Sequence, residues 1–118
     1  MINLSSFSDL THIQLTDFNP KPTSLTAGQL ESLKELWMSD DQKTKVGLWE
    51  CTEGVFTADR SQMAEYCHII SGEAIVENED GSNPRKIKSG DLLVLPIGWK
   101  GKWTITQQMK KLYFLNYP

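Results

Sequence analysis

Two stretches of the sequence decide the fold: Glu65-Tyr-Cys-His-Ile-Ile-Ser-Gly72 and Gly90-Asp-Leu-Leu-Val-Leu-Pro-Ile-Gly98. Each is a short run rich in apolar residues that stops at a turn-forming glycine or proline. Glycine permits the positive φ of a tight turn, and proline ends a strand where its missing N–H is not needed. The pattern therefore predicts short β-strands separated by turns.

The same pattern continues on both sides of these stretches. Strands are expected at 45–51, 64–70, 73–78, 91–95, 103–106 and 111–117, with 91–95 buried. Residues 85–88 lead into a turn at Ser89-Gly90, and Asp80-Gly81 predicts a hairpin. Turns at this spacing are typical of a small antiparallel barrel, in which pairing all the strands leaves few exposed edges.

The first third of the chain gives weaker signals. A first strand is expected at Ile13–Leu15, and Asn19-Pro-Lys-Pro22 predicts a turn or an extended linker. Residues 29–38 fit either a short amphipathic helix or a strand, and the sequence leaves both open. We expect one domain overall, with residues 1–43 as an N-terminal extension packing on a barrel formed by residues 44–118.

Composition and charge exclude several classes of function. The net charge is −3 and no cluster of Lys or Arg is visible, so nothing favours binding to nucleic acid or to an anionic membrane. Two cysteines, Cys51 and Cys67, do not make a disulfide framework. The chain shows no signal-peptide pattern and no apolar run of about 20 residues that could span a bilayer. We expect a soluble cytoplasmic protein with reduced thiols.

Several motifs resemble those of the cupin superfamily. Glu65 followed by six residues and Gly72 is similar to the end of the first cupin motif, and Gly90 followed by five residues and Pro96-Ile-Gly98 is similar to the second. Further matches point to the subgroup related to EutQ and to (S)-ureidoglycine aminohydrolase: Gly47-Leu-Trp-Glu50, Glu65-Tyr-Cys-His68, Asp80-Gly81, Gly90-Asp91, Gly101-Lys-Trp103 and Lys111-Leu-Tyr113. The resemblance covers roughly residues 44 to 117. It implies an all-β fold, a small cupin jelly-roll barrel (double-stranded β-helix) with an N-terminal extension.

The metal ligands of the resembled family are largely missing. A cupin metal is held by three His and one Glu, and of these four only Glu65 is present. The first two His positions fall within residues 58–62 and the third falls on Gly101, and none is a histidine. One carboxylate does not make a metal site, so no cofactor is predicted. A divalent metal held by Glu65 with oxygens of Asp59 or Gln62 remains an open alternative.

Strand alternation predicts what lines the barrel instead. If Glu65 points inward as the family's glutamate does, Cys67 and Ile69 share its face, whereas Tyr66, His68 and Ile70 point outward. The parity of the second motif places Trp103 and Ile105 inside.

These positions predict an aromatic pocket around a buried acid, joined by Trp49 and with a hydroxyl available from Tyr113. An unpaired carboxylate there would have a raised pKa, unless Arg60 pairs with Glu65 and offsets the effect of burial.

The candidate ligand-binding residues are therefore Trp49, Arg60, Glu65, Trp103 and Tyr113, with Glu65 as the candidate catalytic group. The resemblance implies a metal-free or weakly metal-binding cupin domain that binds a small polar metabolite, nitrogenous by analogy with the subgroup. The alternative is a small-molecule enzyme of the hydrolase, lyase or isomerase type, with Glu65 as acid or base and an unconventional metal site. The sequence leaves open whether a reaction is catalysed, which ligand binds and whether the pocket is open. A homodimer is also expected, through the outward residues of the Glu65 strand.

Overall fold

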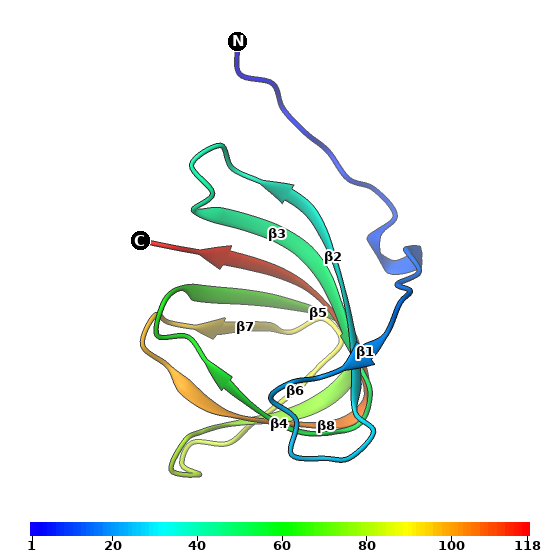
Figure 1. The fold of residues 1–118 in the computed structure, drawn as a ribbon, viewed down its shortest axis with the longest axis vertical. Coiled ribbons are helices and arrows are strands. Elements are labelled where there is room, and N and C mark those ends of the chain that lie inside the picture. The colour runs from blue at the N-terminus through cyan, green and yellow to red at the C-terminus, as the bar shows by residue number, and fades with distance from the viewer.

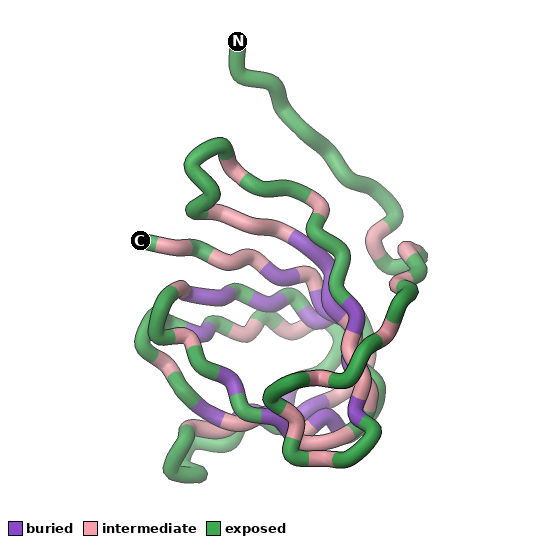
Figure 2. Tube along the Cα trace, viewed as in Figure 1, coloured by how far each residue is buried: buried purple, intermediate pink, exposed green.

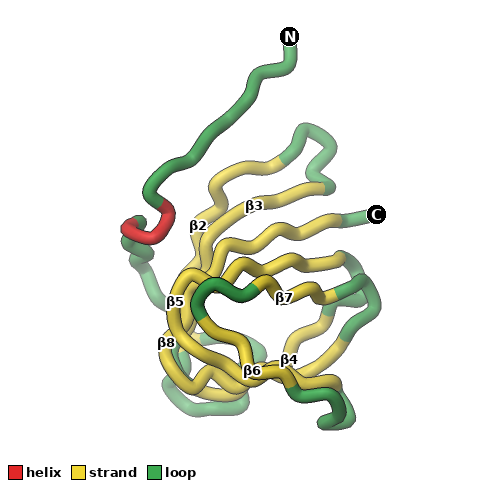
Figure 3. The backbone as a smooth tube through the Cα atoms, turned by 180° about the vertical axis from the view of Figure 1, so that it is seen from behind, coloured by secondary structure: helices red, strands yellow, loops and turns green.

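The strands expected beyond residue 44 form in the computed structural model, which describes residues 1–118 (Figures 1 and 3). They curl into one antiparallel barrel, as the all-β prediction required. The elements are the 3₁₀ turn η1 (Leu10–His12) and the strands β1 (Asn19–Pro20), β2 (Leu30–Met38), β3 (Thr44–Cys51), β4 (Gly54–Asp59), β5 (Ala64–Asn78), β6 (Arg85–Lys88), β7 (Leu92–Leu95) and β8 (Lys100–Asn116). The structure thus contains no helix with the length and apolar character that crossing a membrane requires.

Two long strands, β5 and β8, hold the barrel together. β8 pairs with β3 over its second half and with β4 over its first, and β5 lies against it along nearly its whole length. The remaining order runs β1-β2-β3-β8-β5-β6, with β7 on β5. β4 was not predicted from the sequence, although it carries the segment that leads to Arg60.

The prediction of two strands on either side of Ser71-Gly72 is wrong, because β5 bends there without ending. The pairing of β5 with β8 shifts register between Ile69 and Ala74, which marks β-bulges. Gly72 has φ 88°, and a Cβ at this position would collide with the carbonyl oxygen of Gln108. Its glycine therefore allows a sharp bend in a continuous strand. The same correction applies to residues 103–106 and 111–117, which both belong to β8.

The N-terminal predictions need two corrections. Ile13–Leu15 is not a strand: the side-chain ammonium of Lys110 on β8 donates to the carbonyls of Thr11 and Ile13, so this segment is held by a side chain. Within Asn19-Pro-Lys-Pro22, where a turn or an extended linker was expected, Asn19 and Pro20 form the short strand β1 against β2 and the turn begins only at Pro22.

The open choice for residues 29–38 resolves to a strand. β2 pairs with β3 in the register Leu33 to Trp49, which satisfies the backbone groups along one side of β2. Tertiary pairing decides the conformation where local pattern does not.

The barrel interior follows the predicted alternation (Figure 2). Glu65, Cys67 and Ile69 are buried, whereas Tyr66 and His68 are exposed. Trp103 and Ile105 are likewise buried, on β8.

The strand β7 is not buried as a whole. Leu95 is buried, but Leu92 and Val94 are 66% and 50% exposed on the outer side of the barrel. Period-two alternation explains this result, because a run of four apolar residues on a strand necessarily places two of them on the outer face.

Candidate functional site

A pocket of about 190 Å³ is lined by side chains from five strands and two loops. Most of its wall is apolar, and three cationic side chains and one carboxylate complete it. The lining residues are Lys21, Leu33, Trp49, Phe56, Arg60, Met63, Glu65, Lys111, Tyr113 and Leu115. A small apolar pocket with a few convergent polar groups is the usual form of a ligand site.

Glu65 is the central polar group of this pocket. Its side chain is 3% exposed, and both carboxylate oxygens are engaged by cations. Arg60 donates from Nε to Oε1 at 2.8 Å and its Nη2 lies 2.7 Å from the same oxygen, while Lys111 Nζ lies 2.9 Å from Oε2. Burial raises the pKa of Glu65, but Lys111 and Arg60 outweigh it and lower the pKa to about 2. Of the two expectations for this acid, pairing is the one observed.

Lys111 is the second buried charge. Its side chain is 5% exposed, and Nζ sits 4.4 Å from the ring centre of Trp49 and 4.5 Å from that of Trp103. Burial lowers the pKa of Lys111, but Cys67 and Glu65 reverse the effect and leave the pKa above its ordinary value. Burial raises the pKa of Cys67 itself to about 12, so Glu65 is the negative partner at neutral pH. The ammonium is held by one carboxylate and two indole faces.

Three aromatic rings form the floor beneath these charges. Phe56 stacks on Trp103 with ring centres 5.7 Å apart, and Trp49 meets both rings edge-on. Lys21 Nζ lies 4.4 Å from the Phe56 ring centre and 2.8 Å from Oε1 of Glu31. The same Glu31 oxygen accepts a hydrogen bond of 2.9 Å from Trp49 Nε1. A second ion pair thus fixes the orientation of an indole.

The structure brings together most of the residues predicted from the sequence. Trp49, Arg60, Glu65 and Tyr113 all line the pocket. Trp103 lies outside the lining, fully buried under the Lys111 ammonium, and its Nε1 has no hydrogen-bond partner.

Lys21 and Lys111 are the lining cations that sequence reasoning missed. Lys111 had a usable signal, since it lies two residues before Tyr113 and so shares its face of β8. Lys21 had none, because it follows the proline of a segment with no strand pattern.

The ligand positions implied by the cupin resemblance do not fit a metal ion. Gly101, the third His position, has no room for a side chain: a Cβ there would collide with the carbonyl oxygen of Glu77 and with the Trp99 ring. Arg60 lies within residues 58–62, the range that holds the first two His positions, and its guanidinium already binds Glu65. A metal ion bound to either oxygen of Glu65 would lie beside the guanidinium of Arg60 or the ammonium of Lys111, and their like charges would repel it.

The alternative metal ligands named from the sequence lie outside the pocket lining. Asp59 and Gln62 are both exposed, and Asp59 Oδ1 accepts hydrogen bonds from the backbone and hydroxyl of Ser61. No cluster of three or more His, Cys, Asp or Glu side chains with metal-binding geometry occurs in the structure.

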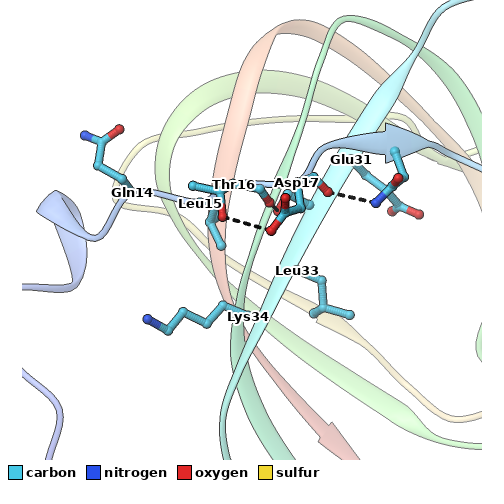
Figure 4. Close-up of a pocket in the computed structure, with 9 residues that line it drawn as sticks. Gln14, Leu15, Thr16, Asp17, Glu31, Leu33 and Lys34 are labelled. Carbon is cyan, nitrogen blue, oxygen red and sulfur yellow. Dashed lines mark hydrogen bonds between the residues drawn. The ribbon is translucent and has the colours of Figure 1, made fainter.

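A larger depression of about 560 Å³ lies between residues 14–19 and β2 (Figure 4). Its lining is mostly polar, and its walls are a loop and a sheet edge. The Ser32 hydroxyl donates to the carbonyl of Thr16 across it, and Asn19 Nδ2 donates to the carbonyl of Asp17 at 2.8 Å. No buried charged group faces it, so the pocket around Glu65 is the stronger candidate.

Comparisons with known proteins agree with this fold. The family model of the EutQ-like cupin domain matches residues 38–113. The EutQ protein of Clostridium difficile superposes with a TM-score of 0.71 at 18% identity, covering 92% of this chain and 84% of that one. A protein described as ethanolamine utilization protein Q of Salmonella typhimurium LT2 gives 0.65 at 20% identity, with 75% and 70% covered.

Ectoine synthase from P. lautus gives a TM-score of 0.67 at 17% identity, covering 81% of this chain and 70% of that one. At these identities the structural neighbours establish the fold alone. A comparison with curated proteins finds no match. The family model spans well over half of the chain, and both cupin motifs lie within it. The chain belongs to the EutQ-like cupin family.

Proposed function

We propose that this protein is a metal-free cupin domain that binds a small polar metabolite in the pocket around Glu65. One observation carries the proposal: the carboxylate that would ligate a metal is bound on both oxygens by Arg60 and Lys111, beside a pocket that remains open. The two side chains supply the positive charge that a divalent ion would otherwise bring to this acid. The family's pocket is thereby kept while its metal chemistry has no residues to support it.

The size of the pocket limits its ligand. A volume of about 190 Å³ equals that of roughly six water molecules in the liquid. This volume suits a single small ring or a short chain, and any larger ligand would extend out of the pocket into solvent. That the ligand is nitrogenous rests on analogy alone, since one structural neighbour is named for the utilisation of ethanolamine.

The enzymatic alternative, with Glu65 as acid or base, has weaker support. A general acid or base is most effective when its pKa lies near the working pH. The pKa of Glu65 lies near 2, and each of its oxygens already binds a cation. This geometry therefore supports ligand binding better than it supports acid–base catalysis by Glu65.

Native mass spectrometry with metal analysis of the same sample tests the metal-free part of the proposal. We expect less than a tenth of an equivalent of any divalent ion, before and after incubation with Zn²⁺, Mn²⁺ or Fe²⁺ at tenfold excess. One equivalent retained per chain would overturn it.

A metabolite and fragment screen by ligand-observed NMR tests the pocket itself. Met63→Trp adds bulk to the pocket wall and should abolish binding, whereas Gln62→Trp, one residue away and exposed, should preserve it. Equal binding by both variants would place the ligand elsewhere. No hit in the screen would leave the barrel as a filled structural module and would refute the proposal.

A further inference from the structure

The charges around the pocket do not cancel. Three cations line it, Lys21, Arg60 and Lys111, and one carboxylate, Glu65. Glu31, paired to Lys21, brings a second carboxylate. The sum of these five groups is one positive charge. Glu35, further along β2, is exposed to water and lies outside the lining, but its charge reaches Tyr113 in the pocket wall and, after burial, contributes most to raising the pKa of that hydroxyl. It forms no ion pair with Lys21 or Arg60, the two less buried cations of the lining.

We infer that the ligand of this pocket is a small monoanion, a carboxylate on a compact apolar or aromatic body, held by Lys21 and Arg60. The inference rests on the proposed function and specifies the chemical class of its ligand. A single negative charge would neutralise the pocket, and the apolar wall of Leu33, Met63 and Leu115 would cover the rest of the molecule. Burying a charge is tolerated where a partner of opposite sign receives it.

A cationic ligand is excluded by the use already made of the aromatic faces. Rings that recognise an ammonium group must present an open face to it. Here Lys111 Nζ lies over Trp49 and Trp103, and Lys21 Nζ lies over Phe56 and, at 5.6 Å, over Trp49. The protein's own ammonium groups thus occupy the positions that a ligand ammonium would need, and they would repel it.

Donors remain available for an anion. A guanidinium carries five N–H groups, and Arg60 uses three of them, two on Glu65 and one on the carbonyl of Asp59. An ammonium carries three, and Lys21 uses one of its own on Glu31. The Arg60 and Lys21 side chains are 21% and 13% exposed, so both are desolvated enough to bind strongly and open enough to be reached. Lys111 also contacts one carboxylate oxygen and two rings, but its side chain is only 5% exposed, so Lys21 and Arg60 are the cations that a ligand reaches more easily.

A matched series of probes separates charge from shape. Benzoate, benzamide and benzamidinium share one ring and nearly one size and carry charges of −1, 0 and +1. Isothermal titration at pH 7 in 50 mM salt should show benzoate binding at least tenfold more tightly than benzamide, with no measurable binding of benzamidinium. The preference for benzoate over benzamide should become smaller in higher salt, because Lys21 and Arg60 are partly exposed and their charges are screened by ions.

Two charge-neutralising variants give effects of opposite sign. Lys21→Gln removes the excess positive charge and should weaken benzoate about tenfold, in line with the loss of one charged hydrogen bond. Glu31→Gln adds to the excess and should tighten benzoate by several fold, while its amide oxygen still accepts from Trp49 Nε1. Lys21→Arg should restore most of the affinity. Lys86→Gln, an exposed lysine on β6, is the control and should change nothing.

The outcomes separate this inference from the proposed function. The inference of an anionic ligand would be overturned if benzamide or benzamidinium bound as tightly as benzoate or more tightly. It would also be overturned if both Lys21→Gln and Glu31→Gln weakened benzoate binding. In either case the pocket would remain a binding site. The inference would likewise be overturned if benzoate did not bind while the metabolite screen found neutral or cationic ligands. Failure of all three probes together with an empty screen would refute both.

Discussion

Replacing Glu65 by glutamine should destabilise the barrel strongly at neutral pH. The variant keeps the shape of the side chain but leaves Lys111 and Arg60 without a negative partner. Lys111 is 5% exposed, so water cannot take the place of the carboxylate. Removing one partner of a buried ion pair typically costs about 3–5 kcal/mol. We expect a loss of this order in the free energy of unfolding at pH 7.

The pH dependence follows from the depressed pKa of Glu65. A group whose pKa falls from 4.5 in the unfolded chain to about 2 in the folded protein stabilises the fold above pH 4.5. That contribution is lost as the pH falls from 4.5 through 2. At about 1.4 kcal/mol per unit of pKa, it amounts to about 3 kcal/mol. The stability gap between wild type and Glu65→Gln should therefore be widest above pH 5 and should narrow steadily below it.

Urea denaturation followed by tryptophan fluorescence at pH 7, 5, 4 and 3 measures this gap. Glu73→Gln is the matched control on the same strand, because Glu73 meets an exposed Lys86 at 3.6 Å and should cost less than about 1 kcal/mol. The double variant Glu65→Gln with Lys111→Met should recover part of the loss, since both buried charges are removed together. A Glu65→Gln variant as stable as wild type, or a gap that stays constant between pH 7 and 3, would refute this account of the site.

Three further predictions follow from other parts of the barrel. Gly101→Ala should lower the free energy of unfolding by about 3 kcal/mol, because the new Cβ would collide with Glu77 and Trp99. Gly90→Ala should cost only about 1 kcal/mol, because Gly90 has φ 93° but no atom within 4 Å of the new Cβ. Urea denaturation measures both, and equal losses would contradict the crowding at Gly101. Burial raises the pKa values of Cys51 and Cys67 to about 12, so a thiol reagent at pH 8 should label neither in the native protein and both in urea; fast native labelling would show an open core. The outer faces of β5 and β7 expose Tyr66, Leu92 and Val94, and we expect a homodimer to form through them. In sedimentation velocity, Tyr66→Glu should give monomers, whereas the control Ile75→Glu should remain dimeric. A dimer that persists in both variants would place the interface elsewhere.

The spacing of glycine and proline predicted the fold because it reflects backbone geometry. Gly72, Gly90 and Gly98 all adopt positive φ, which few other residues tolerate, so their positions mark the turns and the bend directly. Alternation then placed Glu65 and Trp103 inside the barrel correctly. The same reasoning misjudged strand continuity, since a glycine that bends a long strand has the same local appearance as one that ends it.

The site was only half predictable, for a reason that lies in its charges. A lysine in a strand is ordinarily expected at the surface, because burying it alone is costly. Lys111 is buried because Glu65 on β5 and two indoles from β3 and β8 surround its ammonium. That arrangement depends on contacts between three strands. Alternation could place Lys111 on the same face of β8 as Tyr113, but it could not show which groups would surround the ammonium. Arg60 was easier to predict, since it stands at a family motif position next to the only acid retained there.

In the proposed metal-free domain, Arg60 and Lys111 stand beside Glu65 where the cupin motif implies an ion. A carboxylate without a partner would have to take up a proton if it were buried, or else be exposed to water. With no histidine at the three motif positions, Glu65 would be such an unpaired group beside the aromatic rings of the barrel interior. Arg60 and Lys111 resolve that difficulty with two charges of the same total as a divalent cation, placed on the two oxygens of the carboxylate. Because side-chain cations are tethered, they cannot leave, exchange or accept a substrate oxygen as a metal ion does. This difference is the reason for proposing that the pocket beside them binds a ligand and does not activate one.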